Sequence, residues 1–210
     1  MNKMLIAVAV AALTLVPAPA HATTPSVGDL LNQVTVVPAI DHHPGYQRSC
    51  REGEGCVFGP AWNDPNDHSG CDTRSRVLAA QLSDVTFMDG HGCKIASGTL
   101  VDPYSGQTIE YHRGDRSSVQ IDHIVPLALA WDAGAYAWPQ PRRVAFANDT
   151  DELLAVSGKE NEAKGDASIG RWLPPNRAFD CSYIQLYLAV AVKYQLPITT
   201  ADRDTARSCV

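Results

Sequence analysis

The hydrophobic and polar positions predict short strands in the middle of the chain. Residues 94–101 and 107–112 are predicted to pair as a hairpin, because a proline and a glycine lie between them and suit a turn. Residues 119–121 alternate as in a strand and run into Asp122-His123-Ile124-Val125-Pro126. A further short strand is expected at residues 153–156.

Helices are predicted around these strands. Asp72 is expected to cap a short helix with an apolar face, and a second helix should begin at residues 127–131 and end near Gly134. Residues 159–164 form a polar helical segment that Gly165 can close.

The tail is predicted to hold two helices, at residues 177–194 and 200–208, which turn at Leu196-Pro197. With the hairpin and the strand, strand, helix order before them, these elements indicate an α+β fold. The expected fold has disulfide-pinned loops, a helix and a hairpin on its N-terminal side and a helical pair at its C-terminus.

The first residues have the features of a secretory signal. Lys3 supplies a positive charge, residues 5–16 are apolar, and Ala20-His21-Ala22 is a small-x-small cleavage site. Prolines interrupt the apolar run well before the roughly 20 residues that a membrane span needs. We therefore expect residues 1–22 to be removed and the protein to be secreted outside the cell, without stable membrane association.

The remaining chain is expected to contain a leader and one domain. Residues 23–47 show no sustained period, so they are predicted to be a leader that lies over the domain or is partly flexible. Residues 48–210 would form a single domain whose core spans about residues 118–175. A monomer is expected.

An even number of cysteines in an exported chain indicates disulfide bonds before it indicates a metal site. Six cysteines allow fifteen pairings. Closeness in sequence and the predicted helical pair at the C-terminus favour Cys50–Cys56, Cys71–Cys93 and Cys181–Cys209. The Gly- and Pro-rich residues 50–66 would then be a pinned loop.

Net charge adds one limit on function. The formal charge of −6 excludes a uniformly basic protein that coats polynucleotides, but it leaves room for a local cationic groove. Arg113, Arg116 and Arg171 are candidates for such a groove because they flank the strand and helical segments that carry the polar motifs. The four tryptophans are expected to be core and loop anchors, since no basic and aromatic residues alternate around them.

The candidate chemistry lies between residues 121 and 166. His123 has the ordinary pKa of a general base near neutral pH. Asp122 and Asn161 offer hard oxygen ligands of the kind that Mg²⁺ accepts while it keeps several waters. Lys164, one helical turn after Asn161, could neutralise a phosphate as a catalytic and substrate-binding group. Together these residues suit the hydrolysis of a phosphodiester.

The same residues resemble a known family. Asp122-His123-Ile124-Val125-Pro126, Asn148 and Asn161-x-x-Lys164-x-Asp166 are similar to the HNH endonucleases of the ββα-metal fold. Secreted bacterial proteins with an HxxP-type HNH domain, related to the GmrSD restriction enzymes, resemble this chain most, and the HNH domain of CRISPR effector nucleases resembles its core.

The resemblance implies a role for each matching residue. His123 would be the general base, Asp122 and Asn161 the metal ligands, and Asn148 a catalytic-loop residue that helps to orient His123. Many HNH proteins have a further histidine where this chain has Gly165. Its absence favours Mg²⁺ or Mn²⁺ over a zinc cage.

The sequence therefore predicts a secreted, metal-dependent endonuclease that acts on nucleic acid, with DNA favoured and RNA open. Two alternatives remain at this stage. A zinc-dependent peptidase or cell-wall hydrolase would need a third His or Cys ligand, and no HExxH motif occurs. A disulfide-stapled binding protein would have no metal-dependent activity.

Overall fold

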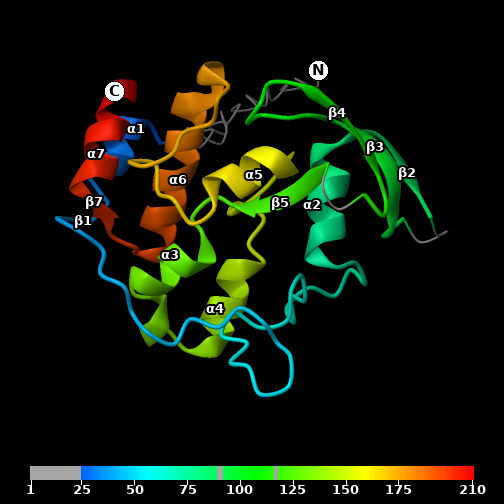
Figure 1. The fold of residues 1–210 in the computed structure, drawn as a ribbon, viewed down its shortest axis with the longest axis horizontal. Helices are drawn as coiled ribbons and strands as arrows, with labels where there is room; N and C mark the ends of the chain where they lie inside the picture. Colours follow the sequence, from blue (N-terminus) through cyan, green and yellow to red (C-terminus); the bar gives the residue numbers. More distant parts are fainter. Residues whose placement is uncertain (1–24, 89–91, 116–117) are drawn as a thin grey trace, which may run out of the picture.

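The computed structural model describes residues 25–88, 92–115 and 118–210 as a mixed α/β protein (Figure 1). The predicted signal peptide, residues 1–22, and Arg116 lie outside the described residues. None of the described helices is long and apolar enough to cross a membrane.

The described residues form α-helices (α), 3-10 helices (η) and strands (β) along the chain. They are α1 (Val27–Leu31), β1 (Val36–Val37), α2 (Thr73–Gln81), β2 (Ser83–Phe87), β3 (Ile95–Val101), β4 (Thr108–His112), β5 (Val119–His123), α3 (Leu127–Asp132), η1 (Ala135–Ala137), α4 (Gln140–Ala147), β6 (Leu153–Ser157), α5 (Gly158–Lys164), η2 (Arg177–Phe179), α6 (Asp180–Tyr194), β7 (Ile198–Thr199), α7 (Thr200–Ala206) and η3 (Arg207–Cys209).

The described strands form three small sheets. Strands β2, β3 and β4 make an antiparallel sheet, β5 and β6 an antiparallel pair, and β1 and β7 a short parallel pair. In the β5–β6 pair His123 lies opposite Leu153, at the point where β5 ends. Helix α5 follows β6 directly and packs on both strands of the pair. This strand, strand, helix unit carries the predicted chemistry.

Strand β5 lies between two hydrophobic clusters because its side chains alternate. Val119 and Ile121 pack into the cluster formed with α2 and the three-stranded sheet. Ile124, just after the strand, packs into the larger cluster around α6. Figure 1 shows the same arrangement, with β5 and α5 between α6 on one side and α2 with β2, β3 and β4 on the other.

Most of the predicted elements are present close to their expected bounds. Asp72 caps α2 by accepting a hydrogen bond from the Ser75 N–H at 2.6 Å. Gly165 ends α5 with φ +55°, where glycine has no Cβ to clash. The hairpin, the strands at 119 and 153, the helix from 127 and the two tail helices are also found.

The leader is an ordered part of the fold from residue 25 onward, in contrast to the flexible alternative. Ser26 and Asp29 form a capping box on α1, and Val27 and Leu30 are buried. Helix α1 packs on α6, and β1 pairs with β7. A helix of five residues and a strand of two are too short to show a period in the sequence.

All six cysteines pair as the sequence favoured. Cys50–Cys56, Cys71–Cys93 and Cys181–Cys209 are bonded, and none is free. The second bond ties the residue before the α2 cap to the segment that precedes β3. Thiolate ligands for a metal are therefore absent, because every cysteine in the chain lies in the described part and is bridged.

Candidate active site

His123 ends strand β5, and a buried glutamate holds the backbone that follows it. Glu152 accepts the Ile124 N–H on its backbone carbonyl at 2.9 Å. Its carboxylate accepts the Val125 N–H at 3.1 and 3.2 Å. Burial raises the pKa of this carboxyl well above its ordinary value. Glu152 thus fixes the turn between the histidine and helix α3.

The imidazole of His123 is held on two sides. Its Nε2 lies 3.1 Å from the carbonyl oxygen of Ala147. Its ring stacks on the indole of Trp62, with centroids 5.8 Å apart and planes at 11°. Since a carbonyl can only accept, Nε2 carries the proton in this contact and Nδ1 is the basic nitrogen.

The surroundings keep this histidine neutral. Burial lowers the pKa of His123 from 6.5 to about 4, and the positive charges of Arg48 and Lys164 act in the same direction. The hydrogen bond with Ala147 opposes that shift in part. At neutral pH the ring is therefore an uncharged proton acceptor with a fixed tautomer.

Among the described residues the Asn148 side chain bonds to groups around the end of α4 and not to the imidazole of His123. Its side chain accepts from the Thr73 hydroxyl at 2.7 Å and donates to the carbonyls of Asn63 at 3.3 Å and Val144 at 2.9 Å. These bonds fix the end of α4, where the neighbouring residue Ala147 presents its carbonyl to His123. Asn148 therefore lies one residue from the carbonyl that contacts the histidine.

Asp122 and Lys164 form a buried ion pair. The Lys164 ammonium donates to both carboxylate oxygens of Asp122 at 2.8 Å and to the His123 carbonyl at 2.7 Å. The Tyr104 hydroxyl donates to the same carboxylate at 2.5 Å. Burial raises the pKa of the Asp122 carboxyl, and the lysine and tyrosine oppose that rise.

The side chain of Lys164 is 0% exposed, so its ammonium does not reach the solvent-facing surface where a phosphate would bind. The sequence placed this lysine on the same face of α5 as Asn161. In the structure α5 instead directs the Lys164 side chain inward, to Asp122 and the His123 carbonyl at the end of β5.

Asn161, Asp122 and His123 line one cavity of about 410 Å³. Asn161 is held by a bond from its amide to the Gln120 side-chain oxygen at 2.7 Å. Asp166, exposed just after α5, lines the same cavity. The three main candidate residues are thus brought together from β5 and α5.

The donor set fits a hydrated hard cation better than a zinc cage. Asp122 and Asn161 both line the cavity, but both carboxylate oxygens of Asp122 already accept from the buried Lys164 ammonium. Among the described residues no group of three or more His, Cys, Asp or Glu side chains could hold an ion. Two protein oxygens and a shell of water match Mg²⁺ or Mn²⁺.

Three cavity residues have no counterpart in the sequence prediction. They are Tyr46, Arg48 and Trp62, which come from the segment before α2 and line the cavity together with Asn161 of α5. They sit in irregular loops without periodicity, so no local signal marks them. Trp62 packs against the hydrophobic cluster around α2, as expected of an anchor, and its half-exposed indole also stacks on the histidine.

The candidate phosphate-binding arginines do not gather around His123. Arg113 lines a second cavity, of about 490 Å³, which also contacts Trp62. Arg171 lines a third, between residues 169–173, Arg177 and Thr205, which shares no residue with the His123 cavity. The position of Arg116 is not described.

Residues 72–205 match the family of the C-terminal domain of GmrSD restriction endonucleases. This range covers more than half of the chain, so the chain belongs to that family, which implies an HNH-like core and a nuclease-related function. Endonucleases with such a core typically depend on a metal and act on nucleic acid. No solved structure matches the chain significantly.

A relative from Arthroderma benhamiae, described as an uncharacterized secreted protein, is 37% identical to this chain over 140 residues. The match covers 66% of this chain and 66% of the relative, slightly less than two thirds of its length. The name of this relative and the three disulfides are both consistent with an extracellular location.

Proposed function

We propose that this member of the GmrSD C-terminal-domain family is a secreted endonuclease that hydrolyses phosphodiester bonds in nucleic acid with His123 as general base. The observation that carries the proposal is the state of His123. The ring is neutral, its tautomer is fixed by Ala147, and it lines one cavity together with Asp122 and Asn161. DNA is the favoured substrate and RNA the second.

In the proposed reaction Nδ1 of His123 takes the proton of a water molecule as that water attacks phosphorus. The P–O bond to one sugar breaks, and the leaving sugar oxygen takes a proton from solvent. Trp62 and the Ala147 carbonyl hold the ring in place, so the base loses little freedom when substrate binds. Asn148 keeps that carbonyl where it is. Lys164 stabilises the end of β5 by donating hydrogen bonds to the Asp122 carboxylate and to the His123 carbonyl.

Asp122 and Asn161 would hold a Mg²⁺ or Mn²⁺ ion in the same cavity. A bound cation of this kind stabilises the negative charge that develops on the phosphate oxygens during hydrolysis. Arg48 adds a fixed positive charge to the cavity, while its guanidinium is anchored to the Gly59 carbonyl at 2.8 Å.

The test is cleavage of plasmid DNA and of RNA by the exported protein in Mg²⁺, Mn²⁺, Zn²⁺ or a chelator. We expect cleavage in Mg²⁺ or Mn²⁺, none in chelator, and a loss of about 10²–10⁴-fold in rate for His123→Ala. His112→Ala, which removes an exposed histidine at the end of β4, is the matched control and should keep the parent rate. A His123→Ala protein with parent turnover would refute the assignment.

A further inference from the structure

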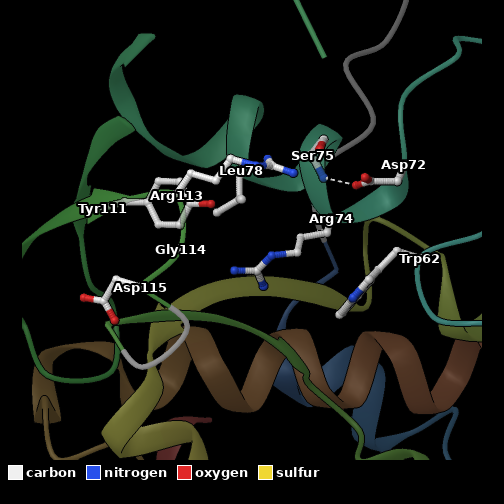
Figure 2. Close-up of a pocket in the computed structure, with 9 residues that line it drawn as sticks. All are labelled: Trp62, Asp72, Arg74, Ser75, Leu78, Tyr111, Arg113, Gly114 and Asp115. Carbon is white, nitrogen blue, oxygen red and sulfur yellow. Dashed lines mark hydrogen bonds between the residues drawn. The ribbon is translucent and has the colours of Figure 1, made fainter. Parts of the chain in front are cut away.

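A second cavity adjoins the one that contains His123. It has a volume of about 490 Å³ and lies between α2 and the end of β4 (Figure 2). Trp62 lines both cavities, so one indole forms a wall of each. The volume falls within the range of small-molecule pockets in proteins, which is sufficient for a nucleotide.

Two guanidinium groups face this second cavity and keep donors free. Arg74, in the first turn of α2, donates to the Val119 carbonyl at 3.2 Å, and Arg113 donates to the Ile95 carbonyl at 3.3 Å. Neither forms an ion pair with a carboxylate in the described part of the chain. Each guanidinium has five N–H donors, so several remain for a phosphate.

Figure 2 shows the Arg74 side chain reaching from α2 into the space between Trp62 and Asp115. Asp72 and Asp115 also line this space, and both accept backbone N–H bonds, from Ser75 at 2.6 Å and from Ser118 at 3.2 Å. The formal charges of the two arginines and the two aspartates that line the cavity sum to zero. The cavity is therefore not a general trap for anions, and recognition must depend on where the guanidinium groups point and on a non-ionic contact.

Trp62 offers that non-ionic contact. Its backbone has φ +63°, in the left-handed region, and its carbonyl accepts the Thr73 N–H at 3.0 Å. The indole is thereby held at the start of α2, half-exposed and parallel to the His123 ring. A rigid aromatic surface beside a catalytic base is suited to stacking a nucleobase.

The distance between Arg74 and His123 fits a single strand of nucleic acid. Arg74 is bonded to the first residue of β5 and His123 is the last, four residues along the strand or about 13 Å. A stacked polynucleotide strand rises about 3.4 Å per nucleotide, so this distance spans a few nucleotides. A base within a duplex is already stacked on both faces and cannot lie on the indole.

We propose that this second cavity binds a nucleotide next to the scissile phosphodiester of a single polynucleotide strand, with its base on Trp62 and its phosphates on Arg74 and Arg113. The proposal rests on the proposed function only for the position of the scissile bond. Strand binding itself requires no hydrolysis and can be measured apart from it.

The experiment measures the binding of short single-stranded DNA and RNA oligonucleotides, and of the matching duplexes, to the full secreted protein in chelator at several salt concentrations. Two phosphate contacts predict a slope of log K against log salt of about −1.4 for a single strand. Arg74→Gln should reduce the magnitude of this slope by about 0.7. Arg203→Gln, on the surface of α7 beside Asp204, removes the same charge elsewhere and should leave the slope unchanged.

Trp62 is tested by two variants that keep the same backbone strain. Trp62→Leu should weaken single-strand binding about fivefold to a hundredfold, while Trp62→Phe keeps an aromatic face and should retain most of it. The parent should also show quenching of tryptophan fluorescence on binding that Trp62→Phe lacks. This second readout stands even if the leucine variant does not fold.

The outcomes separate the two proposals. Parent-like binding by both the Arg74 and the Trp62 variants, or equally tight binding of duplex and single strand, overturns the second site even if the protein cleaves nucleic acid. Loss of binding in those variants supports it even if no cleavage occurs, in which case the proposed hydrolysis fails instead.

Discussion

Replacing Lys164 with methionine distinguishes a structural lysine from one that binds phosphate. The methionine keeps most of the side-chain volume but leaves the Asp122 carboxylate buried without its partner, with the Tyr104 hydroxyl as its remaining side-chain donor. Breaking a buried ion pair by removing one partner costs about 3–5 kcal/mol. For a chain of this size, that loss corresponds to a fall in Tm of about 6–20 °C.

The assay is denaturant unfolding of the parent, Lys164→Met, Asp122→Asn and the double variant. The double variant should lose less stability than the sum of the two single variants, because it removes the charge and its partner together. The loss in Lys164→Met should also shrink as the pH falls, since the unpaired carboxyl can then take up a proton. Lys159→Met, an 87% exposed lysine on the same helix, should change the free energy of unfolding by about 0.5 kcal/mol at most.

The opposite pattern would refute this reasoning. If Lys164→Met unfolds like the parent and instead weakens the binding of oligonucleotides, the ammonium faces the phosphate and the buried pair does not persist in solution.

Four further predictions concern the site and the disulfides. Asn161→Ala should lose activity that returns in part at high Mg²⁺ or Mn²⁺, whereas His123→Ala should not recover; equal recovery would contradict the division of roles. Asp122→Ala should follow Asn161→Ala but also lose stability, because it leaves Lys164 buried and uncompensated. The rate should fall only as the pH drops toward about 4, where the imidazole of His123 gains a proton and can no longer accept one; a midpoint near 6.5 in the profile of kcat/KM would contradict the burial of the ring. Mass spectrometry of the intact protein after alkylation without reduction should find no labelled cysteine, and two or more labels would be inconsistent with three bridges.

Elements with local signals could be predicted from the sequence. The Asp72 cap, the Gly165 stop and the turn between β3 and β4 depend on residues within a few positions of each other, and all three are found. The sequence does not predict strand β2, because both of its faces are largely exposed and its pairing contains register shifts, so its residues show no alternation. The sequence does not predict helix α4 either, because prolines stand at its start, where they also suit a loop.

The candidate site could be predicted only in part. Alternation along β5 puts Asp122 and His123 on opposite faces, and this holds. Alternation does not predict which side chain contacts Asp122. The lysine that does so, Lys164, is 42 residues away in the sequence. Trp62 and Arg48 reach the cavity through long-range packing of loops before α2. Such contacts depend on the whole fold and leave no pattern in the sequence.

In the proposed function, one aspartate-histidine pair serves both structure and chemistry. The two side chains leave β5 in opposite directions, so Asp122 ties the strand to α5 while His123 faces the cavity. A carbonyl from the end of α4, an indole from the loop before α2 and a turn held by Glu152 then fix the ring. None of these contacts requires a bound ion or substrate. In the proposed mechanism, the contacts that orient the His123 ring are therefore separate from those that hold Asn161 and Asp122.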